Sequence, residues 1–205
     1  MKEKIILIGA GGHANSCIDV IELENKFKIA GFVVNDATQK SFKYPILGCD
    51  DDLKNLFKHY KFAFIAIGQI KNAYKRMQIY EKLKSIGFKL PTIVSPLAYV
   101  SPYAFVDEAS IIMHQALVNV NAKIGKACII NSKALIEHDS TVQDFCHIST
   151  AAVVNGECFV KKGSFLGSNT HLKHTQILEE RSIFYNKLSI MGGGISIFTS
   201  FRRSA

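Results

Sequence analysis

The sequence lacks any apolar run long enough to cross a membrane. Its opening, MKEKIILIGAGG, holds only four consecutive apolar residues, Ile5–Ile8, before glycine interrupts them. An export signal has a longer apolar core, and a membrane span needs roughly 20 apolar residues. We therefore expect neither an export signal nor a membrane segment, and we predict a cytoplasmic protein.

Paired cysteines and basic clusters are also missing. The 5 cysteines are an odd number and form no CxxC pair, so disulfides and a structural zinc site are not expected. The net charge is +8, but the basic residues are scattered along the chain. A diffuse positive charge favours small phosphorylated ligands over nucleic acid, and we predict no nucleic-acid partner.

What is present divides the chain into two parts, and the first comprises residues 1–97. Short apolar stretches alternate there with helical patterns, which is typical of a small parallel sheet. We expect strands at Lys4–Ile8, Ile29–Val34 and Phe62–Gly68, and helices at Asn15–Lys26, Asp51–His59 and Tyr74–Ile86. Gly87 suits the end of the last helix, and YPILG is expected to be a loop. These features predict a Rossmann-like α/β domain.

Residues 98–205 follow a six-residue period. An aliphatic residue recurs at every sixth position from Val100 to Leu178, fourteen times in succession, and a mostly small residue follows each one by four positions. This is the signature of a parallel β-helix, in which positions 18 apart stack at about 4.8 Å. The small positions include three cysteines, which we predict to be buried: Cys128, Cys146 and Cys158. Such solenoids commonly bury a face by self-association.

The stretch ALIEHDSTV places polar side chains in this repeat. The six-residue period explains its small and aliphatic residues but does not require Glu137, His138 or Asp139. A neutral imidazole can accept a proton near neutral pH, and an adjacent carboxylate fixes its tautomer and stabilises the cation. A surface histidine and a metal ligand are the alternatives. We predict that His138 is a general base, with Asp139 ahead of Glu137 as its orienting acid.

Several motifs together resemble one family. LIGAGGHA, Asp36, FIAIG and a β-helix containing IINSKALIEHDSTVQDFCHIST and FLGSNT are similar to the bacterial sugar acyltransferases typified by UDP-amino-sugar N-acetyltransferases and sialic acid O-acetyltransferases. The resemblance extends from residue 1 to about 170. It implies a left-handed β-helix, a homotrimer with active sites between subunits, and acetyl-CoA lying along the β-helix. The N-terminal domain would hold a nucleotide sugar.

The resemblance also implies site residues and a reaction. His138 would be the base and Asp139 its acidic partner, in direct transfer of an acetyl group to an amine of the sugar. O-acetylation of sialic acid or a related nonulosonic acid is the alternative. The implied substrate contacts are Gly11, Gly12, His13, Asp36, Gly68 and Asn131. The implied cofactor contacts are His147, Gly156 and Gly167.

Two other enzyme classes share parts of this pattern. The glycine turn satisfies G-x-G-x-x-A with Asp36 after the next strand, as in nicotinamide-dependent oxidoreductases, but a repeat follows where a substrate domain should lie. His138 and His174 are two coils apart in one column, as in γ-class carbonic anhydrases. The third ligand would fall on Glu179 rather than on a histidine, so a three-histidine site is incomplete and we predict no metal.

A binding module without turnover is a third alternative. The six-residue period falters after Leu178, and the chain ends in TSFRRSA where the family has a glycine-rich C-terminal motif. The resemblance places the CoA nucleotide near this end, where Arg202 and Arg203 could partly replace the missing motif.

Overall fold

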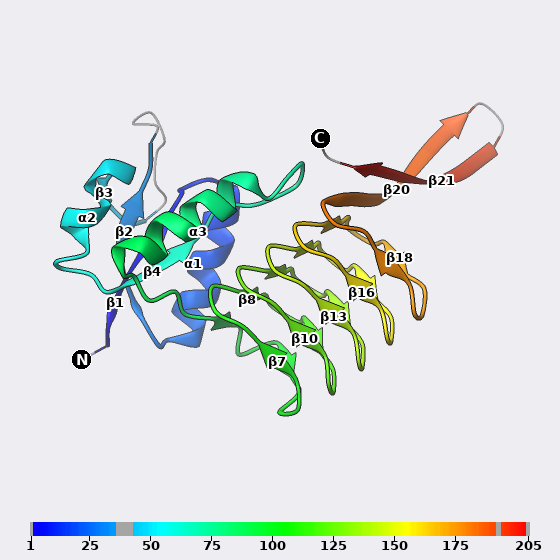
Figure 1. The fold of residues 1–205 in the computed structure, drawn as a ribbon, viewed down its shortest axis with the longest axis horizontal. Helices are drawn as coiled ribbons and strands as arrows, with labels where there is room; N and C mark the ends of the chain where they lie inside the picture. The colour runs from blue at the N-terminus through cyan, green and yellow to red at the C-terminus, as the bar shows by residue number, and fades with distance from the viewer. Residues whose placement is uncertain (1, 36–42, 192–193, 204–205) are drawn as a thin grey trace.

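The protein consists of an α/β domain followed by a parallel β-helix (Figure 1). The structure is a computed structural model that describes residues 2–35, 43–191 and 194–203. The predicted fold class is confirmed. No helix in the described ranges is long and apolar enough to span a membrane.

The α/β domain is built on a parallel sheet with the strand order β3-β2-β1-β4. Its elements are β1 (Lys4–Ile8), α1 (Gly12–Glu24), β2 (Lys28–Val33), β3 (Ile46–Gly48), the 3-10 helix η1 (Asp50–Asp52), α2 (Leu53–Leu56), β4 (Phe62–Ile65) and α3 (Tyr74–Ile86). Successive side chains of β1 alternate between the two faces. Ile5 and Leu7 therefore share a core with α1, whereas Ile6 and Ile8 share one with α3.

The predicted strands and helices of this domain are present, with shifts of a few residues at their ends. Helix α3 ends at the predicted residue, and Gly87 follows it with a left-handed backbone, φ 106°. The prediction that YPILG is a loop was wrong, because part of it forms β3 at the edge of the sheet.

The β-helix is made of two-residue strands, one in each hexapeptide. They are β5 (Ile93–Val94), β6 (Tyr99–Val100), β7 (Phe105–Val106), β8 (Ile111–Ile112), β9 (Leu117–Val118), β10 (Lys123–Ile124), β11 (Ile129–Ile130), β12 (Leu135–Ile136), β13 (Thr141–Val142), β14 (His147–Ile148), β15 (Val153–Val154), β16 (Phe159–Val160), β17 (Phe165–Leu166), β18 (His171–Leu172) and β19 (Ile177–Leu178). Strands 18 residues apart pair in parallel, so that His147 lies between Ile129 and Phe165. Three sheets result, one for each face of the coil.

Both ends of the β-helix depart from the repeat. At its start, β5 pairs with β8, so the first coil begins before the predicted domain boundary between residues 97 and 98. At its end, β20 (Ser182–Met191) pairs with β17 and then forms an antiparallel hairpin with β21 (Gly194–Arg203). The hairpin projects beyond the last coil (Figure 1). Arg202 and Arg203 belong to β21, but their side chains lie outside the described part of the chain.

The six-residue period produces the expected core. The aliphatic row is buried from Ile112 to Leu178, and Val100 and Val106 pack against it partly buried. The three cysteines predicted to be buried are buried: Cys128, Cys146 and Cys158. The period that positions the core therefore runs from Val100 to Leu178.

A second six-residue row consists of turn residues in the left-handed conformation. It runs from Ala109 to Arg181 at every sixth position and includes Asp139, with φ 59°, and Gly163, with φ 72°. This conformation disfavours most side chains, whereas glycine, asparagine and aspartate tolerate it. Asp139 thus occupies a turn position of the repeat, which neighbouring hexapeptides fill with residues as different as Lys133 and Phe145.

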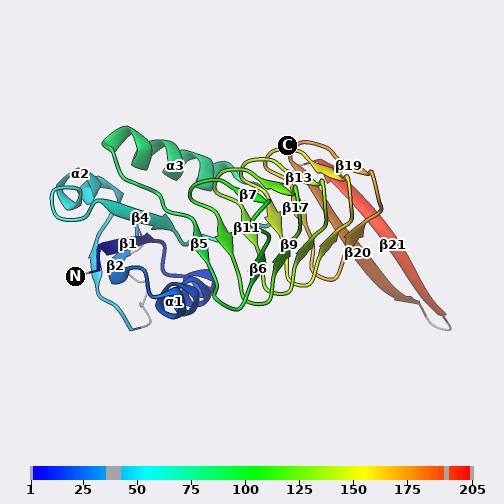
Figure 2. The same ribbon diagram turned by 90° about the horizontal axis from the view of Figure 1, so that it is seen from below.

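The two domains share their cores. Ile111 and Ile129 of the β-helix pack with α1, and Ala127 and Phe145 pack with α3. Figure 2 shows α3 running from the α/β sheet toward the first coils and α1, seen nearly end-on, beside them. The sheet that contains β14 is therefore the face of the β-helix that meets the α/β domain.

Candidate active site

A cavity of about 580 Å³ opens where β1 and β4 lead into α1 and the loop before α3. In the strand order β3-β2-β1-β4, the chain adds β2 and β3 on one side of β1 and then β4 on its other side. This change of side is the topological switch point at which parallel α/β sheets bind ligands. Gly11 and Gly12 line this cavity at the start of α1. Gly11 is the N-cap residue of α1, and no side chain accepts a hydrogen bond from the first N–H groups of the helix. These N–H groups are therefore available to an anion such as a phosphate.

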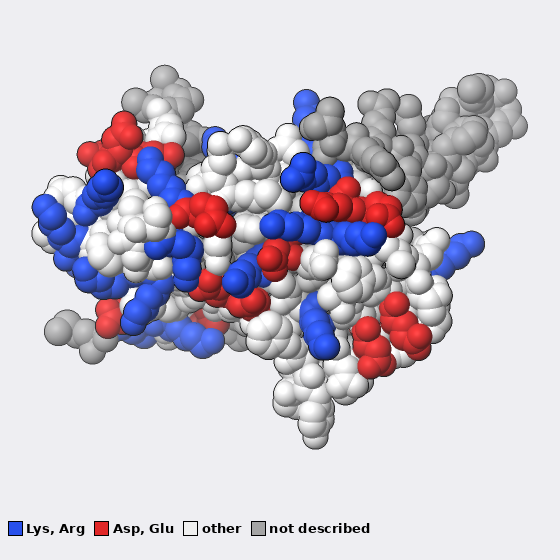
Figure 3. Space-filling view, viewed as in Figure 1, with Lys and Arg blue, Asp and Glu red and all other residues white. Residues whose placement is uncertain are grey.

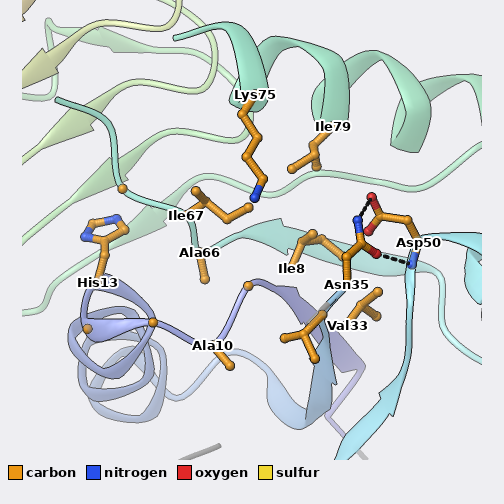
Figure 4. A pocket seen from close by; sticks show the side chains of 15 residues that line it. Ile8, Ala10, His13, Val33, Asn35, Asp50, Ala66, Ile67, Lys75 and Ile79 are labelled. Atoms are coloured by element: carbon orange, nitrogen blue, oxygen red, sulfur yellow. Dashed lines mark hydrogen bonds between the residues drawn. The ribbon is translucent and has the colours of Figure 1, made fainter. Parts of the chain in front are cut away.

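Three polar side chains that the sequence analysis did not single out surround the same cavity. Asn35 and Asp50 are joined by two hydrogen bonds, from Asn35 Nδ2 to Asp50 Oδ2 at 2.8 Å and from the Asp50 N–H to Asn35 Oδ1 at 2.9 Å. Figure 4 shows Lys75 reaching toward the cavity from the opposite side. Asp36, predicted to contact the substrate, lies outside the described residues. Asn35 and Asp50 supply donor and acceptor atoms at the end of β2.

His13 and Gly68 close the cavity on the side of the β-helix. Both line it, and a Cβ at Gly68 would lie 3.4 Å from the Cβ of His13. Burial, followed by the charge of Arg76, lowers the pKa of His13 to about 3. His13 is therefore neutral at physiological pH. Its Nε2 is buried and has no hydrogen-bond partner among the described residues.

His147 and Asn131 lie beside this part of the cavity. The His147 ring centroid is 6.5 Å from that of His13, and its Nε2 lies 3.2 Å from Asn131 Nδ2. His147 Nδ1 donates a hydrogen bond to the carbonyl oxygen of Gln69 at 2.5 Å. Burial lowers the pKa of His147 to about 4. The structure thus brings together three of the predicted site residues, His13, Asn131 and His147.

His138 lies elsewhere, at the corner between β12 and β13. Its Nδ1 is 2.8 Å from Asp139 Oδ2, and 44% of its side chain is exposed. Asn121 Nδ2 donates to the other Asp139 oxygen at 3.1 Å. The hydrogen bond to Asp139 raises the pKa of His138. An exposed imidazole oriented by a carboxylate is suited to accept a proton from a bound acceptor.

Glu137 is directed to other partners. Its Oε2 accepts hydrogen bonds from Asn119 Nδ2 at 2.7 Å and from the His138 N–H at 3.3 Å. It contributes negative charge near the imidazole but does not hold the ring. Asp139, which the sequence analysis ranked ahead of Glu137, is therefore the carboxylate in contact with the ring.

The two predicted cofactor glycines adjoin protein atoms. A Cβ at Gly156 would lie 2.7 Å from His138 Nε2, so glycine leaves room for that ring. A Cβ at Gly167 would lie 2.7 Å from the Cβ of Tyr185, and the Gly167 N–H donates to the carbonyl oxygen of Phe184 at 2.7 Å. Close packing accounts for both glycines, and their contact with a cofactor stays a prediction.

Known proteins resemble both the α/β domain and the β-helix of this chain. Residues 4–83 match the PglD N-terminal domain family. The chain is similar to the acetyltransferase domain of PglB from Neisseria gonorrhoeae FA1090, with 28% identity over 86% of this chain and 85% of that chain and a TM-score of 0.78. The same domain in complex with acetyl coenzyme A gives 26% identity over 86% and 85% of the two chains and a TM-score of 0.79.

A third solved structure resembles the chain over nearly its full length. It is a mutant of perosamine N-acetyltransferase from Caulobacter crescentus in complex with CoA and GDP-perosamine, with 24% identity over 95% of this chain and 96% of that chain and a TM-score of 0.67. The similarity of fold to this third structure therefore includes both domains. Residues 4–83 belong to the PglD N-terminal domain family, and the chain as a whole is an acyltransferase that resembles solved sugar acetyltransferases.

Four residues that line the cavity of the acyltransferase were not selected by the sequence analysis: Asn35, Asp50, Lys75 and Ile79. The sequence contains a signal for some of them but not for all. Lys75 and Ile79 lie four positions apart on α3 and line the same cavity, a spacing that places them on one helix face. Asn35 adjoins the predicted Asp36. Asp50 carries no local signal, because only the pairing of β2 with β3 brings it to Asn35.

The surface charge of the acyltransferase and its His138–His174 pair bear on two predictions made from the sequence, a scattered positive charge and an incomplete metal site. On the face seen in Figure 3, acidic side chains are interspersed with lysines and arginines over both domains. His174 lies 3.6 Å from Glu157, and its ring centroid is 6.1 Å from that of His138. No group of three or more histidine, cysteine or acidic residues in the described ranges could hold a metal ion. A third ligand for the histidine pair is thus not seen in those ranges.

Proposed function

We propose that this acyltransferase transfers an acetyl group from acetyl-CoA to an amino group of a nucleotide-activated sugar. The observation that carries the proposal is the exposed His138–Asp139 pair on a chain whose α/β domain has a cavity of about 580 Å³ at the glycine turn. Relatives support both substrates, since the PglB domain was solved with acetyl coenzyme A and perosamine N-acetyltransferase with CoA and GDP-perosamine.

In this mechanism His138 is the general base. Asp139 accepts a hydrogen bond from the Nδ1–H of the neutral His138 ring, so the lone pair on Nε2 is free to take the proton of the acceptor amine. The amine nitrogen bonds to the thioester carbonyl carbon while its proton passes to Nε2. The bond from carbon to sulfur then breaks, and CoA leaves as a thiol after taking that proton from the imidazolium. Asp139 stabilises the imidazolium in the intervening step.

A covalent acyl-cysteine is not needed for this reaction. Cys146 is fully buried in the core, and its Sγ donates to the carbonyl oxygen of Lys161 at 3.1 Å. Burial raises the pKa of Cys146 well above its ordinary value. A thiol in this position is neither accessible nor ionised, so it is unsuited to act as a nucleophile.

We also propose that the active protein is a homotrimer. His138 does not line the nucleotide cavity of its own chain, so a second copy is needed to bring an acceptor to the base. Large apolar side chains are exposed on the early coils: Tyr99, Tyr103, Phe105 and Val120. A hollow of about 360 Å³ lined by Tyr103, Phe105 and Asp139 joins this apolar surface to the His138–Asp139 pair. Apolar surface of this kind is typical of protein interfaces.

Thiol release from acetyl-CoA tests the activity. The acceptors are UDP- and GDP-linked 4-amino sugars, CMP-sialic acids and free nonulosonates, with mass spectrometry of the products. We expect N-acetylation of a nucleotide amino sugar and a loss of about 10²- to 10⁴-fold in kcat for His138→Ala. Undiminished turnover by His138→Ala would show that the base is misassigned. An O-acetylated sialic acid would instead support the alternative acceptor, and acetyl-CoA binding without turnover would support a binding module.

Sedimentation velocity tests the assembly. The chain has a mass of 22.7 kDa, so a trimer should sediment as a species of about 68 kDa. Phe105→Glu places a charge in the proposed interface and should shift the protein to smaller species with lost turnover, while nucleotide binding persists. A wild-type monomer with full activity would contradict the proposed site between subunits.

A further inference from the structure

Arg76 is a buried cation at the junction of the two domains. It projects from α3 and is only 2% exposed. Its Nη1 donates to the carbonyl oxygens of Ile65 at 3.2 Å and Ile67 at 2.5 Å, and its Nη2 donates to that of Ala127 at 2.7 Å. Within the described ranges it forms no ion pair with a carboxylate, and its Nε has no partner.

Burial of this charge has an energetic cost. Transfer of an ion from water to the protein interior is strongly unfavourable, and carbonyl dipoles offset this penalty only in part. Burial lowers the pKa of Arg76 to about 10, so the side chain is still protonated at neutral pH. An apolar side chain would fill the same space without that cost, which indicates that the contacts of Arg76 have a role beyond packing.

Gln69 continues the row of contacts that Arg76 begins. Its Nε2 donates to the carbonyl oxygens of Phe145 at 2.8 Å and Gly163 at 3.4 Å. Ala127, Phe145 and Gly163 are left-handed turn residues one coil apart at the same corner of the β-helix. Arg76 and Gln69 therefore fasten the segment from residue 65 to 69 to three stacked turns.

This segment also determines the tautomer of His147. The carbonyl oxygen of Gln69 can only accept, so His147 Nδ1 carries the ring hydrogen and Nε2 has the lone pair. Nε2 then accepts from Asn131 Nδ2 at 3.2 Å, while Asn131 Oδ1 accepts the Ser132 N–H at 2.8 Å. Both nitrogens of His147 are occupied. The ring is thus suited to hold the Asn131 amide rather than to transfer protons.

We propose that Arg76 is a positioning residue that, with Gln69, holds the segment between the nucleotide cavity and His147 in register with the β-helix and so orients the amide of Asn131. Gly68 lies in the middle of the segment and lines the cavity. One hydrogen of the Asn131 amide is bonded to His147 Nε2, so the contacts that hold His147 also fix the direction of the other amide hydrogen. That it faces the acceptor sugar rests on the proposed function, whereas the link from Arg76 to His147 does not.

The link can be tested without turnover, by NMR of the 15N-labelled histidine rings of the intact protein. His147→Gln identifies the resonances. We expect a neutral His147 with hydrogen on Nδ1 in the wild type, and a loss of this single tautomer in Arg76→Met. Lys82→Met is the matched control, since Lys82 lies on the same helix with an exposed side chain 4.0 Å from Asp51 and should leave the spectrum unchanged.

Kinetics then show whether the link matters for the reaction. In Arg76→Met, kcat/KM for the acceptor should fall by about tenfold or more, as expected for a misplaced substrate contact, while the KM for acetyl-CoA stays within about twofold of the wild type. Arg76→Lys keeps the charge but not the planar group that reaches three carbonyls, so it should recover only part of the loss.

The outcomes separate this proposal from the proposed function. If Arg76→Met does not fold, Gln69→Ala makes the same test, because it removes the contacts to Phe145 and Gly163 but keeps the backbone carbonyl. A folded variant of either kind with an unchanged His147 tautomer, or a wild-type ring with hydrogen on Nε2, would overturn the link. A changed tautomer in a protein that acetylates no sugar would support the link and refute the function.

Discussion

Replacement of Gly156 by alanine tests the position of the proposed base without altering a catalytic group. The new Cβ would lie 2.7 Å from Nε2 and 2.8 Å from Cε1 of His138, and 3.0 Å from Cε1 of His174. Ordinary contacts between carbon atoms are about 3.5–4.0 Å, so the His138 ring must move by roughly 0.8 Å or more. Its 2.8 Å contact with Asp139 would then lengthen or break.

The magnitude of the effect follows from this displacement. Misplacement of a reacting group by about 1 Å can cost about 10²-fold in rate, and we expect a loss of that order in kcat. Stability should change little, because the atoms that must move belong to the end of an exposed side chain and Gly156 has no positive φ. A change below about 1 kcal/mol corresponds to a shift in Tm of less than about 4 °C.

Steady-state thiol release and differential scanning calorimetry together make the assay. His174→Ala is the control, since it removes the neighbouring ring and leaves the contact of His138 with Asp139 in place, and it should retain activity. Wild-type kcat in a folded Gly156→Ala protein would refute the reasoning, because the reaction would then tolerate a displaced His138.

Three further predictions concern Asp139, Cys146 and Ile148. Asp139 raises the pKa of His138, so Asp139→Asn should lower that pKa toward about 6.5, move the rising limb of kcat to lower pH and reduce the plateau; an unmoved limb in the pH profile would contradict the pairing. Cys146→Ala should retain turnover, and inactivity of the folded variant in the thiol assay would point to a nucleophilic cysteine. Ile148→Ala removes a fully buried side chain, which should cost about 2–5 kcal/mol and lower Tm by roughly 5–20 °C; calorimetry that shows less than about 2 °C would argue against its place in the core.

The β-helix could be predicted in detail because each of its hexapeptides carries the same local signal. Ile130, Ile136 and Ile148 point inward at the same place in their repeats, so period alone identifies them. The edge strand β3 has only three residues and no such repetition, and it forms because β2 offers it a partner. Asp139 could be singled out as polar, but its left-handed backbone becomes evident only when the turns are compared.

The candidate site was predictable where its residues belong to a short motif. Gly11, Gly12 and His13 adjoin one another in the sequence and do line the cavity. Arg76 and Gln69 had no such signal, since an arginine on a helix and a glutamine in a loop usually lie at the surface. Their partners on the β-helix are 51 to 94 residues away, so only the docking of the two domains reveals what they do.

The attachment of the α/β domain to three stacked turns restricts how this chain can change length in evolution. A duplicated coil of 18 residues beyond β17 would leave the contacts of Arg76 and Gln69 untouched. A coil of different sequence inserted between Ala127 and Asn131 would still offer turn carbonyls to Gln69, but it would carry Asn131 and His147 about 4.8 Å along the axis and away from the carbonyl oxygen of Gln69. The side chains at this attachment therefore restrict growth to the far end of the β-helix, where β20 and β21 follow the last coil.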